Sequence, residues 1–437
     1  MSHRHDATTP RILFASAIST ICLAIALTAQ TPSNTIALVG ARVIDGTGAA
    51  PIANATVLIS NGRIERVGPS AALKVPAGAT RIDVAGRTII PGLVNAHGHL
   101  GHGDPKLPVY DQIIQQLQLY PRFGVTTVYA LGDDGVQSVR VSEENNKGPL
   151  SRARLFVSGA RATGSTPEEA RKVIAERHAL RVNIIKTGIG EGSNAPGQDM
   201  RTEAYTALID EAHKRKLRVA AHLVNLADAK GLVNAGLDII AHSIRDQDVD
   251  AAFIAELKRR NVGYIPTLTR DLSVFQYEST PDYINDPFFL RGMPNYAAQI
   301  ERVKDPALHA KIKANPGTQV SKRQLEQGLR NLKLLSDGGV MIAMGTDSGT
   351  GTGRWQGYFE QVEMELMVKA GMTPMQALVA STGNAAKVMH IDNEVGTLQP
   401  GKRADFVVLT ADPLADIKNT RTIESVWIDG RALGSGL

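Results

Sequence analysis

Eight short runs of apolar residues recur along the chain, and they constrain its fold more than any other feature. They lie near Leu93, Thr126, Leu155, Ile184, Val219, Ile239, Tyr264 and Met341. Runs that are apolar on both faces are typical of strands buried in a parallel sheet. Segments with helical periodicity separate them, such as the one that begins at Pro167. This alternation predicts an α/β fold, and eight units predict a (β/α)8 barrel, also called a TIM barrel.

Six residues that could bind metal ions end five of these runs: His97, His99, Lys186, His222, His242 and Asp347. Alternation along a strand points His97 and His99 to the same side. In a parallel barrel the carboxyl ends of all strands lie on one face, so we expect the six side chains to converge there. Each residue could instead be structural, as a core histidine, a lysine with a buried stem or a helix cap. Their joint placement favours a metal centre.

These motifs together resemble the amidohydrolase superfamily, which consists of metal-dependent hydrolases built on a distorted (β/α)8 TIM barrel. The resemblance rests on residues 91–99, Lys186, His222, His242 and residues 345–348. Residues 396–409 also resemble the strand that such enzymes return to a small β-sandwich beside the barrel. The resemblance covers nearly the whole chain after the first thirty or so residues, and it is strongest to the imidazolonepropionase-like and prolidase-like branch.

The resemblance implies a pair of divalent metal ions, with zinc expected. His97 and His99 would bind a buried ion, and His222 and His242 a more exposed one. Lys186 would bridge the two ions after it reacts with CO2, because an ammonium has no lone pair, whereas a carbamate offers anionic oxygens. Imidazolonepropionases proper resemble single-metal members that lack this lysine, so their reaction is not transferred.

The implied chemistry is hydrolysis by a metal-bridged hydroxide. Asp347 would ligate the buried ion, accept the proton of the water and deliver it to the leaving amine. The predicted enzyme is a metal-dependent amidohydrolase that cleaves an amide-type C–N bond in a peptide or an N-acyl amino acid. A lactone, carbamate, ester or phosphotriester hydrolase on the same centre is the alternative. A third alternative is a non-enzymatic barrel protein. The presence of all six potential ligands argues against it.

The pattern of the chain predicts four segments. Residues 1–29 combine two early arginines with an apolar stretch and predict a signal peptide, hence a periplasmic or secreted protein, although an uncleaved anchor stays open. No other segment could span a membrane, and Cys22, the one cysteine, lies in this stretch. Residues 35–90 and 391–437 are expected to form one β-sandwich, with a hairpin at Asn61-Gly62. Residues 91–390 would form the barrel, whose last helix begins with a capping box at Thr373.

A long insertion separates the last two runs, between residues 264 and 341. Residues 275–296 hold six aromatic residues: Phe275, Tyr277, Tyr283, Phe288, Phe289 and Tyr296. A loop that follows a barrel strand opens onto the active-site face, so Tyr277 and Phe288 could belong to a lid that binds an apolar substrate group. The alternative is that these aromatics pack the loop against the barrel or form a subunit contact.

Four further residues on this face are candidates for substrate binding: His102, Arg245, Arg270 and Arg354. An arginine could clamp a substrate carboxylate with two parallel donors, although surface arginines are commonly just solvated. The expected partner is therefore a small molecule or a short peptide. The formal charge of +5 is spread without a basic run, so nothing indicates nucleic-acid binding. The family resemblance suggests self-association, but no residues specify an interface.

Overall fold

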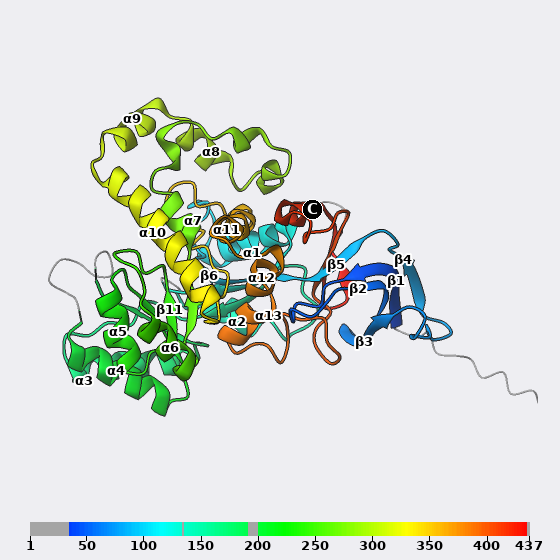
Figure 1. Cartoon of the computed structure of the whole chain (residues 1–437), viewed down its shortest axis with the longest axis horizontal. Coiled ribbons are helices and arrows are strands. Elements are labelled where there is room, and N and C mark those ends of the chain that lie inside the picture. The colour runs from blue at the N-terminus through cyan, green and yellow to red at the C-terminus, as the bar shows by residue number, and fades with distance from the viewer. Residues whose placement is uncertain (1–34, 133–134, 191–199, 435–437) are drawn as a thin grey trace, which may run out of the picture.

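Both ends of the chain contribute to one β-rich unit, as predicted, and its strands form a single eight-stranded sheet (Figure 1). The computed structural model describes residues 35–132, 135–190 and 200–434, so the predicted signal peptide lies outside the described residues. The strands run in the order β15-β14-β13-β5-β1-β2-β3, with β4 beside β1. Their bounds are β1 Thr35–Val43, β2 Ile52–Ser60, β3 Arg63–Pro69, β4 Thr80–Asp83, β5 Thr88–Pro91, β13 Phe406–Leu409, β14 Ile423–Ile428 and β15 Arg431–Ala432. The antiparallel pairing of β5 with β13 joins the two ends.

The predicted hairpin turn at Asn61-Gly62 is present between β2 and β3. Asn61 and Gly62 have φ values of 51° and 77°, and Ser60 pairs with Arg63 across the turn. Two positive φ angles are what a two-residue turn of the primed type requires, and Asn-Gly adopts them at low cost. On the core side of the sheet, Phe406 stacks on Trp427 with ring centroids 5.1 Å apart.

Seven of the eight predicted barrel strands form, all in parallel pairs. One sheet contains β6 Leu93–Gly98, β7 Val125–Ala130 and β8 Arg154–Val157, and the other contains β9 Ile185–Gly188, β10 Val219–His222, β11 Ile239–Ala241 and β12 Gly263–Ile265. The fold is thus of the TIM-barrel type, although these two sheets are not one continuous ladder in the described residues.

The eighth run corrects the prediction of a regular strand. It lies between β12 and β6 and makes only the isolated parallel bridges Tyr264↔Ile342 and Gly98↔Ser348. The backbone N–H groups of Thr346 and Asp347 both donate to the carbonyl of His97, at 3.0 and 2.7 Å. Asp347 also has a φ of 57°. A strand ladder cannot accommodate this doubled contact, and the turn it produces brings the Asp347 carboxylate toward β6.

Helices follow most of the barrel strands and cover the outside of the sheets (Figure 1). They are α1 Val109–Leu119, α2 Val136–Glu143, α3 Pro167–Ala179, α4 Thr202–Lys214, α5 Leu226–Asn234, α6 Ala251–Arg260, α11 Tyr358–Lys369, α12 Pro374–Ala380 and α13 Gly383–Val388, with the 3-10 turns η1 Tyr120–Phe123 and η5 Ile417–Arg421. The predicted capping box at Thr373 is confirmed. The Thr373 side chain accepts from the backbone N–H of Gln376, and the Gln376 side chain accepts from the backbone N–H of Thr373.

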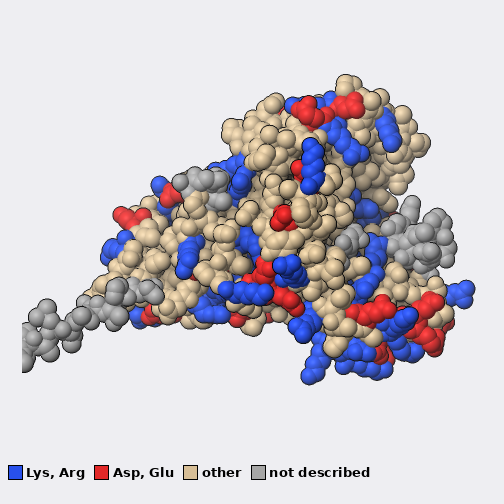
Figure 2. Space-filling model, turned by 180° about the vertical axis from the view of Figure 1, so that it is seen from behind, with Lys and Arg blue, Asp and Glu red and all other residues tan. Residues whose placement is uncertain are grey.

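The insertion forms a largely helical layer that stands above the barrel in Figure 1. It contains α7 Leu268–Leu272, η2 Gln276–Glu278, η3 Asp282–Asn285, η4 Phe289–Gly292, α8 Ala297–Val303, α9 Pro306–Ala314 and the long α10 Gly317–Asp337. None of the helices in the described chain has the length and apolar character that crossing a membrane requires. Figure 2 shows basic and acidic residues interspersed on the face it presents, in keeping with the absence of a basic run in the sequence.

Candidate metal centre

The six predicted ligand residues lie at the ends of the barrel strands and are all buried. Lys186 lies within β9 and His222 ends β10, whereas the other four come from β6 or directly follow their runs. The exposed fractions of the six are 1% for His97, 5% for His99, 1% for Lys186, 4% for His222, 3% for His242 and 6% for Asp347. Because an isolated polar group is costly to remove from water, six polar side chains this deeply buried need hydrogen-bond, ionic or metal partners.

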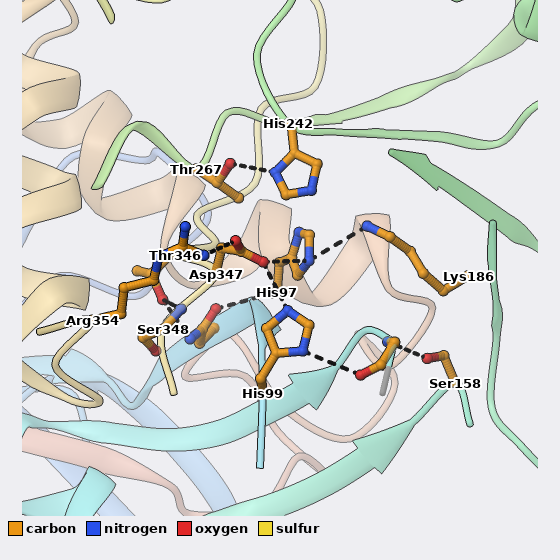
Figure 3. A network of polar contacts seen from close by, with 12 residues as sticks. His97, His99, Ser158, Lys186, His242, Thr267, Thr346, Asp347, Ser348 and Arg354 are labelled. Carbon is orange, nitrogen blue, oxygen red and sulfur yellow. Dashed lines mark hydrogen bonds and ion pairs between the residues drawn. The ribbon is translucent and has the colours of Figure 1, made fainter. Parts of the chain in front are cut away.

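Two histidines converge on one carboxylate oxygen (Figure 3). The Oδ1 atom of Asp347 lies 2.8 Å from the Nε2 of His99 and 3.2 Å from the Nε2 of His97. The Nδ1 of His99 lies 3.2 Å from the carbonyl oxygen of Gly132, which can only accept, so Nδ1 is assigned as the donor. In the neutral ring, Nε2 then carries a lone pair that faces a carboxylate. A cation between them would relieve this repulsion, and the donor set therefore fits a metal ion.

His242 extends the cluster from the opposite side. Its ring centroid lies 4.7 Å from that of His97 and 4.4 Å from that of His222. Its Nδ1 is hydrogen-bonded to the Oγ1 of Thr267 at 2.8 Å, which fixes the ring orientation. Potential ligand atoms of His97, His242 and Asp347 all lie within 4.8 Å of one another. The buried Nε2 of His222 has no hydrogen-bond partner in the described part of the chain, so it too is available as a ligand.

Burial sets the protonation state of the histidines. It lowers the pKa of His97 to about 3, and the positive charge of Lys186 adds to the effect. The Nζ of Lys186 lies 3.4 Å from the Nε2 of His97. Burial and nearby cations also hold the pKa values of His222 and His242 well below the usual range. All three imidazoles are therefore neutral at physiological pH, which is the form that ligates metal ions.

Asp347 is held in its ionised form. Burial alone would raise its pKa, but the positive charge of Arg354 leads the effects that outweigh burial and hold the pKa well below the usual range. The Nη1 of Arg354 lies 2.5 Å from the Oδ2 of Asp347, and its Nε donates to the Oγ of Ser273 at 3.0 Å. One carboxylate oxygen thus faces the histidines and the other faces an arginine, as Figure 3 shows.

The three arginines considered as clamps for a substrate carboxylate all have partners within the chain. Arg354 already binds Asp347. Arg245 and Arg270 both contact the buried carboxylate of Asp271, at 3.7 and 2.7 Å. All three guanidinium groups therefore have carboxylate partners within the chain, and a substrate would have to compete with them.

Of the two alternatives for Tyr277 and Phe288, a substrate-binding lid or packing against the barrel, the structure agrees with packing. Tyr277 is 1% exposed, and its hydroxyl donates to the carbonyl of Gly353. Phe288 packs edge-on against Phe123, with centroids 5.3 Å apart. The alternative interpretation describes both residues, since the aromatics pack the insertion onto the barrel.

His102 is exposed on the loop after β6 and lines a hollow of about 550 Å³. Lys106, Gln116, Gln299 and Arg354 also line this hollow. Because Arg354 contacts Asp347 as well, the hollow adjoins the candidate centre. Its volume falls within the range of small-molecule sites.

The sequence interpretation missed two acids on α11. Glu360 and Glu363 have no exposed surface, and burial raises their pKa values to about 7 and about 8. They lie one helical turn apart, among the apolar residues Phe359, Met364 and Met367. Two acids on the apolar face of a helix were the signal that could have identified them.

Comparison with known proteins places the chain in a family. A model of the Amidohydrolase family matches residues 88–433, so the chain belongs to this family and is an enzyme, as the sequence predicted. Enzymes of this family generally use divalent metals, which agrees with the cluster of His97, His242 and Asp347.

Individual relatives agree with this assignment. The chain is 25% identical to a 5-methylthioadenosine/S-adenosylhomocysteine deaminase of Symbiobacterium thermophilum over 85% of its own length and 84% of the relative. It is 24% identical to an imidazolonepropionase of Stenotrophomonas maltophilia over 86% and 90% of the two chains. Among solved structures, it is similar to a candidate prolidase from Bifidobacterium longum, with 28% identity, a TM-score of 0.75, and coverage of 92% and 95%.

Proposed function

We propose that this enzyme is a binuclear metal-dependent hydrolase that cleaves an amide-type C–N bond in a peptide or an N-acyl amino acid. The observation that carries the proposal is the convergence of two histidine Nε2 atoms on one oxygen of Asp347, with Lys186 beside them. The similarity to a candidate prolidase supports a peptide-like substrate.

In this proposal, His97, His99 and Asp347 hold one divalent ion, and His222 and His242 hold the other. Lys186 would bridge them as a carbamate, formed when its neutral amine adds to CO2 with loss of one proton. This change replaces a positive charge among buried histidines with a negative one, and so removes an electrostatic conflict. When bound, the two ions would supply an acidified water and a polarised scissile carbonyl, and zinc is the expected metal.

The residues of the chain would manage the protons. Asp347 accepts a proton from the attacking water at its carboxylate and delivers it to the leaving nitrogen as the C–N bond breaks. Arg354 keeps this carboxylate ionised until the proton arrives. The hollow lined by His102 and Gln299 is large enough to take one side of a dipeptide-sized substrate.

A substrate panel tests the proposal. The zinc-loaded enzyme is assayed with dipeptides and N-acyl amino acids, and in parallel with a lactone, a carbamate, an aryl ester and a phosphotriester. We expect the amide substrates to give the largest kcat/KM and Asp347→Asn to abolish turnover. The exposed Asp282 supplies the control variant Asp282→Asn, which should behave as wild type. Faster hydrolysis of any other class would replace the amide assignment with that class.

The location of the enzyme is a separate proposal. We infer from residues 1–29 that the chain is exported to the periplasm or beyond. The test is the intact mass of the protein recovered from a periplasmic extract, which shows where its N-terminus lies. Cleavage near residue 29 supports export, and an intact N-terminus in the cytoplasmic fraction contradicts it.

A further inference from the structure

Two fully buried glutamic acid side chains on α11 contact the segments that carry the candidate metal centre. Glu360 and Glu363 are one helical turn apart and therefore point to the same side of the helix. In the described part of the chain, neither forms an ion pair with a lysine or an arginine. Each instead accepts hydrogen bonds from segments that carry the predicted ligands, and the two serve different halves of the centre.

Glu360 braces the half that contains His97 and Asp347. Its Oε1 accepts from the side-chain nitrogen of Asn95 at 2.5 Å and from the hydroxyls of Thr346 and Ser348 at 3.1 and 3.0 Å. Thr346 and Ser348 flank Asp347 on both sides. The Oδ1 of Asn95 accepts from the backbone N–H of His97 at 2.9 Å. One carboxylate oxygen thus connects β6 to the turn that carries Asp347.

Glu363 braces the half that contains His242. Its Oε1 accepts from the backbone N–H of Leu268 at 2.7 Å, and its Oε2 accepts from the backbone N–H and the hydroxyl of Thr269, both at 2.7 Å. The preceding residue, Thr267, has a φ of 50° and binds the Nδ1 of His242. The carboxylate therefore holds the strained turn from which His242 is oriented.

We propose that Glu360 and Glu363 are positioning residues that set the separation between the two halves of the metal centre. Because both lie on one rigid helix, they fix the turn after β12 relative to the turn after the eighth run. The hydroxyl of Thr269 also contacts the carbonyl oxygen of Thr346 at 3.1 Å and links the two turns directly. This inference rests on the proposed binuclear centre and adds residues outside its ligand set.

The hydrogen bonds of the two acids predict different responses to substitution by glutamine. All three donors of Glu360 converge on Oε1, and its buried Oε2 has no partner in the described residues. The carbonyl oxygen of a glutamine can keep these three bonds. Glu363 accepts one backbone N–H at each oxygen, that of Leu268 at Oε1 and that of Thr269 at Oε2, so a glutamine must turn its NH2 group toward one of these donors and lose at least one bond. Glu363→Gln should therefore disturb the centre more than Glu360→Gln.

Cobalt binding to the full-length chain tests the inference without a substrate. Co²⁺ affinity is measured by titration, ligand geometry by the visible absorption of the bound ion, and folding by thermal unfolding. The control is Glu365→Gln, on the same helix, whose carboxylate binds Arg421 away from the centre. We expect Glu363→Gln to weaken one Co²⁺ site by about 10–100-fold and to change its spectrum. Glu360→Gln and the control should resemble wild type.

One result would overturn the inference alone: a Glu363→Gln protein with wild-type affinity and spectrum. A wild-type chain that bound no Co²⁺ would overturn the proposed function together with the inference. If Glu363→Gln does not fold, Thr269→Val removes one donor to the same oxygen. It should shift the spectrum in the same direction, and an unchanged spectrum would again contradict the positioning role.

Discussion

Thr267→Val isolates a single contact of the candidate metal centre. Thr267 has no exposed surface, and its Oγ1 lies 2.8 Å from the Nδ1 of His242. Valine has nearly the same shape and is also branched at Cβ, so the strain of the positive φ angle at this position stays similar. The substitution removes the hydroxyl and leaves the buried Nδ1 of His242 without its partner.

The expected loss follows from this one hydrogen bond. An unsatisfied buried polar group costs about 1–3 kcal/mol, and removing a partner of a ligating histidine typically weakens metal binding about 10–100-fold. We therefore expect one of two metal sites to weaken by that factor, measured by competition with a chelator, while the site at His97 and His99 keeps its affinity. Thr267→Ser retains the hydroxyl and should resemble wild type. Equal affinities in wild type and Thr267→Val would refute the assignment of His242 as an oriented ligand.

Three further predictions follow from other parts of the molecule. Asp347→Asn should lower turnover much more than metal content, and comparable losses of both would contradict a proton-transfer role. Arg154 is 2% exposed and contacts the buried Asp405 at 3.3 Å, so Arg154→Met should lower the free energy of unfolding in urea by about 3–5 kcal/mol without changing a cobalt spectrum. The metal-free protein should lose stability as the pH falls from neutral toward about 4. Burial and Lys186 lower the pKa of His97 from 6.5 to about 3, so in this window the unfolded chain binds more protons than the folded one. His97→Gln should reduce this pH dependence of the urea midpoint, and an unchanged slope would contradict it.

The positions of the barrel strands and the potential ligands could be read from the sequence because both depend on local patterns. An apolar run fixes where a buried strand lies, and the residue that ends it must emerge at the active-site face. The hairpin turn at Asn61 and the helix cap at Thr373 were predictable for the same reason, since the residues that specify each of them lie within a few positions of one another. The irregular eighth run was not predictable, because the contact of Asp347 with the carbonyl of His97 joins residues far apart in the chain.

The sequence could not predict which residues these side chains contact, because those contacts join segments far apart in the chain and no local pattern reveals them. Arg354 was one of three arginines considered for substrate binding, and its partner within the chain is Asp347. For Tyr277 and Phe288 the sequence left a lid and packing against the barrel as alternatives, and their burial in the insertion agrees with packing. Glu360 and Glu363 were missed because their hydrogen bonds reach β6, the turn after β12 and the eighth run at once.

The most direct test of the proposed centre is the metal content of the purified chain, measured by elemental analysis in bicarbonate buffer. Wild type is compared with Lys186→Ala and with a control at an exposed lysine, Lys172→Ala. The account predicts about two divalent ions per chain in wild type and in the control, and a clear loss in Lys186→Ala. A single ion that is insensitive to Lys186 would contradict the bridged binuclear centre.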